Sequence, residues 1–143
     1  MIKNILCAVD VADPKQDIPV LKRAGKLAEI EGAQLDLVTV VPDYGLSVVG
    51  SYFSEDQHEA AVAEAKRRMK EIAEVELGAD VNDNIRHVVA TGKAYEEILK
   101  AASASETDLI VIGAHAPDLQ DFLLGPNAAR VVRHSSCSVY VVR

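Results

Sequence analysis

The stretch DLIVIGAHAPDLQDFLLGPNAARVVRHSSCSVYVVR, from Asp108 to Arg143, decides the fold of this 143-residue chain. It opens with an apolar run, Leu109 to Ile112, that stops at Gly113. A loop then leads to Gly125, a segment with helical spacing follows, and a short apolar run, Val139 to Val142, comes last. This order predicts a strand, a glycine-bounded loop, a helix and a second strand. Such a loop leads from the carboxyl end of a buried strand to a helix amino terminus, where unpaired N–H groups and the helix dipole favour an anion.

Upstream of this stretch, apolar runs alternate with segments of helical spacing. The expected strands are Ile2 to Val9, Leu35 to Val41, Ile85 to Ala90, Asp108 to Ile112 and Val139 to Val142. The expected helices are Val20 to Glu31 with a stop at Gly32, Ser54 to Leu77, Ala94 to Ala102 and Asn127 to His134. Strict alternation predicts an α/β protein with right-handed crossovers and a parallel sheet covered by helices on both faces. No linker or repeat interrupts the pattern, so residues 1–143 are expected to form a single domain.

The net charge of the chain is −7, which argues against nucleic acid or an anionic membrane as a partner. The one basic cluster, Lys66 to Lys70, is interleaved with Glu64 and Glu71 and is expected to form a solvated helix face. No apolar run reaches the roughly 18–20 residues that a membrane span needs. Cys7 and Cys137 lie far apart in apolar contexts without a secretory leader, which favours buried thiols over a redox role and predicts a cytoplasmic protein.

Motifs for catalysis are scarce. There is no Gly-Lys-Ser/Thr of a Walker loop, no nucleophile elbow, and no metal-ligand spacing among His58, His87, His115 and His134. An enzyme is therefore not expected, and the alternative left open is slow hydrolysis at a site that holds Asp10 and a metal ion.

The final stretch resembles the carboxyl-terminal signature of the universal stress protein family: Gly, two residues, Gly, nine residues, then Gly followed by Ser or Thr. The matching segments are Val-Ile-Gly-Ala-His around Gly113, Leu-Leu-Gly ending at Gly125, and the Cys-Ser-Val-Tyr-Val-Val-Arg tail. The sequence departs from the signature where Ala116 replaces the middle glycine, where Pro117 to Leu124 is one residue short, and where Pro126 replaces Ser or Thr. The His-x-Pro-Asp spelling is similar to the F/G-type branch of the family.

The resemblance implies a five-stranded sheet of order 3-2-1-4-5 and an adenine nucleotide alpha-hydrolase-like fold. The strand order then reverses between the first and fourth strands, and ligands of open α/β sheets bind outside the strand ends at such a reversal. Asp10 and Gly113 are expected to face one another there. The implied ligand is an adenine nucleotide, ATP, ADP or AMP, with or without Mg²⁺.

The same resemblance assigns roles to residues before and at the ends of the strands. Asp10, preceded by Ala8 and Val9, corresponds to the aspartate that approaches the ribose and the metal-bound phosphates; its alternative role is an Asx-turn. Val40, next to Val41, corresponds to the position whose backbone meets the adenine edge.

Residues of the final loop are assigned to the phosphates. Gly113 and Gly125 are expected to use positive φ and a close backbone approach, although simple chain turning also needs glycine. Asn127 is expected to cap the last helix and to offer its N–H to an anion. His115 either flanks the phosphates or is solvated.

Two substitutions in this loop are expected to weaken binding. Ala116 adds a Cβ, and Pro126 removes both a hydroxyl and a backbone N–H. Each lost hydrogen bond to a charged group costs about 1.5–3 kcal/mol, so ATP is expected to lose more affinity than AMP. Pro126 still suits the first turn of a helix.

The last strand predicts a partner. Ser138 to Arg143 is expected at the sheet edge, where the resemblance implies a homodimer formed by antiparallel pairing of this strand; the alternative is an edge protected by its terminal charge and Arg143. The main functional hypothesis is a cytoplasmic, homodimeric, adenine-nucleotide-binding regulator of the stress response. Its rival is the same fold with an empty site, acting through protein contacts, and a small nucleotide hydrolase is the third class.

Overall fold

The computed structural model describes residues 1–42, 55–114 and 124–143, and these residues form one parallel sheet of five strands. The strands are β1 (Asn4–Ala8), β2 (Gln34–Val41), β3 (Arg86–Thr91), β4 (Leu109–Gly113) and β5 (Ser138–Val142). Their order in the sheet is β3-β2-β1-β4-β5, and all neighbouring pairs are parallel. The predicted fold class and strand order are therefore confirmed, with the reversal between β1 and β4.

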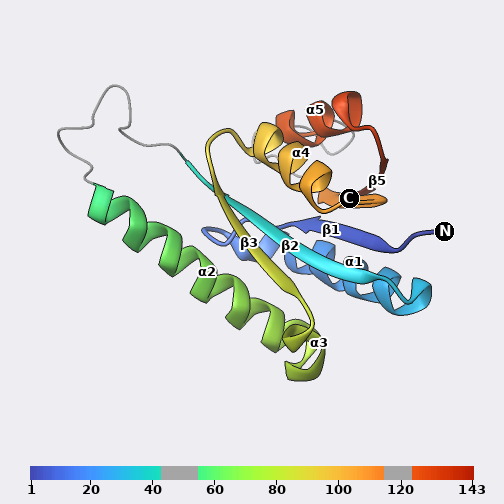
Figure 1. The fold of residues 1–143 in the computed structure, drawn as a ribbon, viewed down its shortest axis with the longest axis horizontal. Coiled ribbons are helices and arrows are strands. Elements are labelled where there is room, and N and C mark those ends of the chain that lie inside the picture. Colours follow the sequence, from blue (N-terminus) through green and yellow to red (C-terminus); the bar gives the residue numbers. More distant parts are fainter. Residues whose placement is uncertain (43–54, 115–123) are drawn as a thin grey trace.

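Helices cover both faces of this sheet. They are η1 (Pro14–Gln16), α1 (Ile18–Glu31), α2 (Glu55–Leu77), α3 (Ala79–Asp83), α4 (Ala94–Ala104) and α5 (Pro126–His134). Figure 1 shows α4 and α5 on one face and α1 and α2 on the other. The four long helices were predicted, but η1 and α3 were not, because both are single turns in segments rich in Asp, Asn and Pro that read as loops. The expected helix cap at Ser54 lies outside the described residues.

Strand β1 is the centre of the molecule. Ile5, Leu6 and Cys7 are at most 1% exposed, because β1 has a strand on each side and helices above and below. Ile5 and Cys7 point into the layer of α1 and α2, whereas Leu6 and Ala8 point into the layer of α4 and α5. Burial on both faces explains why the sequence of this strand is an unbroken apolar run instead of an alternating one.

The helices contribute the apolar stripes that their sequences predict. In α2 the buried residues are Ala65, Met69 and Ala73, one helical turn apart, and they pack with α1 on the first face. On the second face Ile98 of α4 and Val131 of α5 are the main buried aliphatic residues. Burying one such large side chain contributes about 1.5–3 kcal/mol, so these stripes fix the helices to the sheet.

Two helices end in a residue with left-handed backbone conformation. Gly32 ends α1 with a φ of 62°, as the sequence predicted. After α4 the same role falls to Glu106, with a φ of 51°, and the next N–H, that of Thr107, donates to the carbonyl of Ala102 at 2.9 Å. Glycine adopts this conformation freely, whereas for a residue with a Cβ it costs about 1–2 kcal/mol, so a glutamate here does not predict a helix end.

The imidazole of His87 lies between β3, α2 and α3. Its Nε2 is 2.7 Å from Oδ1 of Asn82. Partial burial lowers the pKa of His87, and the ammonium groups of Lys70 and Lys66 on α2 lower it further. The folded protein therefore favours the neutral imidazole.

We expect this histidine to make folding stability depend on pH. The unfolded chain takes up the proton near pH 6.5, and the folded chain does so only at lower pH, so acidification below about pH 7.5 favours the unfolded state. Urea unfolding of the wild type and of His87→Gln between pH 8 and pH 5 measures this. The wild type should lose stability relative to the variant as the pH falls, and parallel curves would contradict the assignment.

Candidate functional site

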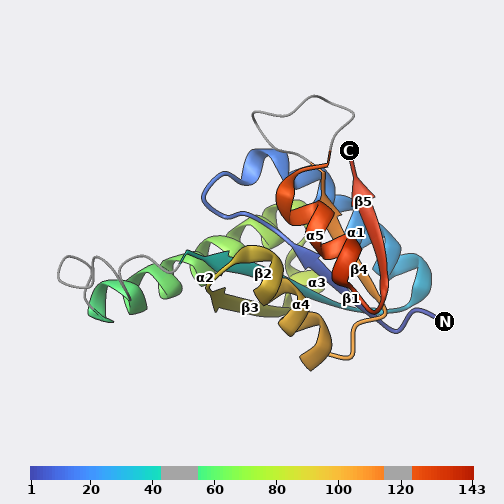
Figure 2. The same cartoon turned by 90° about the horizontal axis from the view of Figure 1, so that it is seen from above.

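A cleft of about 940 Å³ opens at the carboxyl ends of β1, β2 and β4. The segment after β1 and the beginning of α5 lie at this same end of the sheet (Figure 2), and α2 provides a further wall. The predicted site residues that line it are Ala8, Val9, Asp10, Val40, Gly113, Gly125, Pro126 and Asn127. His115 and Ala116 lie outside the described residues. The structure thus brings together residues from four separate parts of the chain.

The backbone of Val40 faces this cleft. The N–H of Val9 donates to the carbonyl of Val38, so the backbone of Val38 faces β1. Val40 is the next residue of β2 whose backbone faces that way, but β1 has already ended at Ala8. On this side Val40 therefore has no strand beside it, although β3 pairs with β2 on the other side. The carbonyl of Val41 points the opposite way and accepts from the N–H of Gly92 at 3.0 Å. Because successive backbone groups of a strand alternate in direction, Val40 can offer both an N–H and a C=O to the edge of a bound ring.

Asp10 lies at the rim of the cleft and forms the Asx-turn that the sequence analysis gave as its alternative role. Its Oδ1 accepts from the N–H of Ala12 at 3.0 Å. Its own N–H donates to Oδ2 of Asp17 at 2.7 Å. The side chain is exposed to the cleft, so the Asx-turn fixes the carboxylate where a ligand can reach it.

Asp17 is a cleft residue that sequence reasoning missed. It precedes α1 and its carbonyl accepts from Leu21 at 2.9 Å, but its side chain makes no cap and turns back to Asp10 instead. Its charge also adds to burial in raising the pKa of the Cys7 thiol, which keeps that thiol protonated. The only sequence signal was an aspartate in a turn ahead of a helix, and that signal predicts a cap.

Gly113 allows close packing at this point because it has no side chain. A Cβ there would lie 3.1 Å from Cγ2 of Val20 and 3.2 Å from Oδ1 of Asp17. The expectation of positive φ at Gly113 and Gly125 is wrong: Gly125 has a φ of −63°, and Gly113 is not among the described residues with positive φ. The close approach is real, but it is between β4 and α1 within the protein.

The amino terminus of α5 points into the cleft. Gly125 is the residue before the helix, and its N–H donates to the carbonyl of Ala114 at 2.9 Å. The expectation that Asn127 caps the helix is wrong, because Pro126, with its preset φ, begins the helix one residue earlier. Asn127 and Ala128 follow in the first turn, where N–H groups have no helical acceptor. Both line the cleft, so an anion can use them.

The basic cluster on α2 divides into two parts. Arg67 pairs with Glu64 at 2.6 Å and with Glu71 at 2.7 Å on the exposed face, as predicted. Hydrogen bonds from Arg67, and then from Arg68, lower the pKa of Glu64 to about 2. Arg68 is exposed as well, with 49% of its side chain accessible, so the prediction of a solvated face holds for it, and it also lines the cleft.

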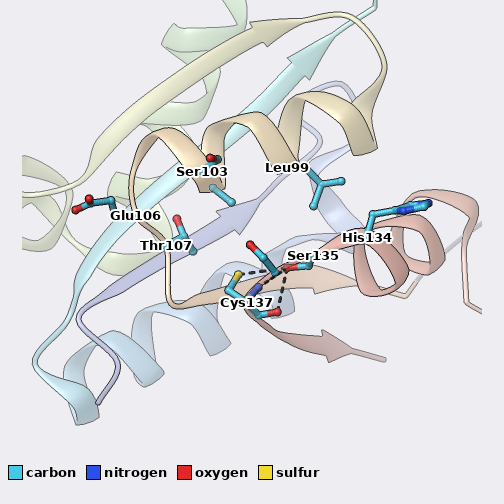
Figure 3. A pocket seen from close by; sticks show the side chains of 9 residues that line it. Leu99, Ser103, Glu106, Thr107, His134, Ser135 and Cys137 are labelled. Carbon is cyan, nitrogen blue, oxygen red and sulfur yellow. Dashed lines mark hydrogen bonds between the residues drawn. The ribbon is translucent and has the colours of Figure 1, made fainter.

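A smaller cavity of about 260 Å³ lies at the other end of the sheet, between the carboxyl ends of α4 and α5 (Figure 3). Cys137 lines it and is only partly buried, whereas a buried thiol was predicted. Its Sγ is 3.3 Å from Oγ of Ser135. Oγ1 of Thr107 is buried there with no partner among the described residues. Thr107 and Cys137 both precede strands, which places the cavity opposite the large cleft and away from the strand carboxyl ends.

Among the described residues, no helix combines the length and the apolar sequence needed to cross a bilayer. The same residues hold no group of three or more His, Cys, Asp or Glu side chains suited to a metal ion.

A parallel sheet whose order reverses beside an open cleft defines a doubly wound α/β protein with a cleft at its switch point. The sequence model of the universal stress protein family matches residues 1–143. The chain belongs to that family.

Relatives of known sequence and structure agree with this assignment. Universal stress protein G of Escherichia coli O157:H7 is 28% identical over 149 aligned positions, with all of both chains covered. The solved structure of MJ0577, a universal stress protein of Methanocaldococcus jannaschii, has a TM-score of 0.80 and 25% identity, with 99% of this chain and 96% of that chain covered.

Two more distant structures share the fold and carry nucleotides. A universal stress protein in complex with cAMP has a TM-score of 0.69 at 19% identity, covering 99% of this chain and 97% of that chain. One from Archaeoglobus fulgidus in complex with dAMP has a TM-score of 0.62 at 19% identity, with both chains fully covered.

Gly113→Ala tests the packing at the switch point. The added Cβ must displace Val20 or Asp17, and we expect a loss of about 1–3 kcal/mol in the free energy of unfolding. Val20→Ala removes the methyl group, Cγ2, that the new Cβ would approach. The loss in the free energy of unfolding of the double variant should therefore be smaller than the sum of the two single losses, by at least about 0.5 kcal/mol. Denaturant titration of the four proteins measures this coupling, and additive effects would contradict the contact.

Proposed function

We propose that this protein binds an adenine nucleotide, ATP, ADP or AMP, in the cleft and acts as a regulator of the stress response and not through turnover. One observation carries the proposal: the free backbone edge of Val40 and the first turn of α5 line the same cavity. The first can hydrogen-bond the edge of a purine, and the second can bind a phosphate. The exposed carboxylate of Asp10 lies at the rim of the same cavity, where it can accept ribose hydroxyls or hold Mg²⁺.

The relatives support the class of ligand. Structures of this fold in complex with cAMP and with dAMP show that adenine nucleotides bind to other universal stress proteins. Regulation is proposed over catalysis because the sequence has neither a Walker lysine nor a nucleophile elbow. We place the protein in the cytoplasm, as one domain.

We further propose a homodimer formed through β5. This strand is at the edge of the sheet, and its central residue, Tyr140, is 39% exposed. An exposed edge rich in Val and Tyr presents unpaired backbone groups to a second copy of itself. Antiparallel pairing about a twofold axis satisfies both edges at once.

The second candidate is the same fold acting through protein contacts with an empty cleft. The observation that favours it is Pro126, which occupies the first position of α5 and has neither an N–H nor a hydroxyl. The Asx-turn of Asp10 also favours this candidate, because it gives the carboxylate a structural role that needs no ligand.

Calorimetric titration with ATP, ADP and AMP, with and without Mg²⁺, separates the two candidates. Pro126→Ser restores two donors to the cleft, and we expect it to tighten ATP binding by about tenfold or more. Pro19→Ser is the control, because Pro19 is the second residue of α1 and so also lies in the first turn of a helix, but it does not line the cleft. Absence of heat with all three nucleotides would favour the protein-contact candidate, and unchanged ATP affinity in Pro126→Ser would refute the role given to that residue.

The dimer is tested by a charge at the sheet edge. We expect Tyr140→Lys to yield a monomer, because an ammonium group at the middle of β5 disfavours pairing of the two copies. Light scattering coupled to size-exclusion chromatography gives the mass. Val75→Lys is the control, since Val75 is 80% exposed on α2 and far from β5 in the fold. A wild type that is monomeric at all concentrations would exclude the proposed dimer.

A further inference from the structure

Side chains from successive turns of one face of α2 form a wall of the cleft. Ala61, Glu64, Ala65 and Arg68 all line it, with the spacing of residues on one face of a helix. The two alanines leave room beside the sheet. The glutamate and the arginine add charge, and the arginine is the last of the row.

The guanidinium of Arg68 is held beside the segment that follows β1. Its Nε donates to Oε1 of Glu64 at 3.1 Å, and its Nη1 is 3.5 Å from the carbonyl oxygen of Val11. A guanidinium has five N–H bonds, and the described residues provide no acceptor for the other three. Arg67, one residue earlier, directs all three of its nitrogen atoms at Glu64 and Glu71. Arg68 therefore keeps donors for a ligand, whereas Arg67 is engaged on the surface.

The charge of the cleft gives Arg68 a particular importance. Among the described residues that line it, the carboxylates are Asp10, Asp13, Asp17 and Glu64, and Arg68 is the one lysine or arginine. An anionic ligand that enters meets mostly like charge. Arg68 and the first turn of α5 are the groups that oppose this repulsion.

We propose that Arg68 binds the phosphate of the ligand and that the cleft accepts a nucleoside monophosphate in preference to a triphosphate. The inference rests on the proposed nucleotide function and names the residue that recognises the anion. The guanidinium offsets part of the charge of about −1.5 to −2 on a monophosphate, and the first turn of α5 adds a partial positive charge. The remaining N–H donors of Arg68 suit the oxygen atoms of that group. A triphosphate brings further negative charge towards four carboxylates, which requires Mg²⁺ to be neutralised.

The test compares adenosine with AMP, which differ only in the phosphate. Wild type, Arg68→Met, Arg68→Lys and Arg67→Met are titrated with both ligands and with ATP at one ionic strength, without Mg²⁺. Arg67→Met removes the same charge from the same helix, so it controls for the change in overall charge and for the loss of a contact to Glu64. Thermal melting confirms that each variant is folded.

We expect Arg68→Met to weaken AMP binding by about tenfold and to leave adenosine binding within about twofold. Arg68→Lys should recover part of the loss, because it keeps the charge without the planar fork. Arg67→Met should behave as the wild type, and the wild type should bind AMP more tightly than ATP.

Other results would overturn the proposal in distinguishable ways. If the wild type binds both ligands but Arg68→Met weakens the binding of adenosine and AMP equally, the nucleotide function stands and the role of Arg68 fails. The same conclusion follows if Arg67→Met weakens AMP binding as much as Arg68→Met does. A wild type that binds ATP more tightly than AMP would overturn the preference for a monophosphate. If the wild type binds neither adenosine nor any nucleotide, the proposed function fails and the role of Arg68 with it.

Discussion

The contact between Asp17 and the two strand ends beside it is the constraint on which the cleft depends. The carboxylate of Asp17 accepts the N–H of Asp10 after β1, and Gly113 at the end of β4 has no side chain that would push it away. The helices that follow these two neighbouring strands lie on opposite faces of the sheet, α1 on one and α5 on the other (Figure 1). Without that arrangement β1 and β4 would still pair, but the segment after β1 would not be fixed at the rim of the cleft.

The cleft combines acidic side chains with backbone groups that favour anions. Negative charge comes from the loop after β1 and from Glu64, while the first turn of α5 and Arg68 contribute positive charge. Because the positive groups are few, the loss of one hydrogen-bond donor is expected to change the affinity for an anion. Pro126 lacks an N–H, which affects binding, but proline suits the first position of a helix, so folding is little affected. Under the proposed function, charge and not the volume of about 940 Å³ is the property expected to discriminate between adenine nucleotides.

The fold keeps its polar features at the two ends of the sheet and its centre apolar. β1 is buried on both faces, so a polar group in its middle would lose its hydration without gaining a partner. Helix α5 begins at the large cleft and ends at the small cavity beside Thr107 and Cys137. Among the described residues, a helix amino terminus and an unpaired strand edge line the same cleft only at the carboxyl ends of the strands, where the strand order reverses.

The sequence by itself determined the α/β class, the parallel sheet, the five strands and the four long helices, because burial on both faces demands apolar runs and amphipathic helices demand a 3.6-residue period. Its resemblance to a known family also gave the strand order and a set of residues that the fold gathers at one cleft. Only the tertiary structure decided what those residues do locally: Gly113 makes room for α1, Asp10 takes the Asx-turn, and Arg68 lines the cleft from an exposed position on α2. The reason is physical. Periodicity records which side of an element is buried, but a carboxylate or a guanidinium chooses among partners that are distant in the chain, and folding alone brings those partners within reach.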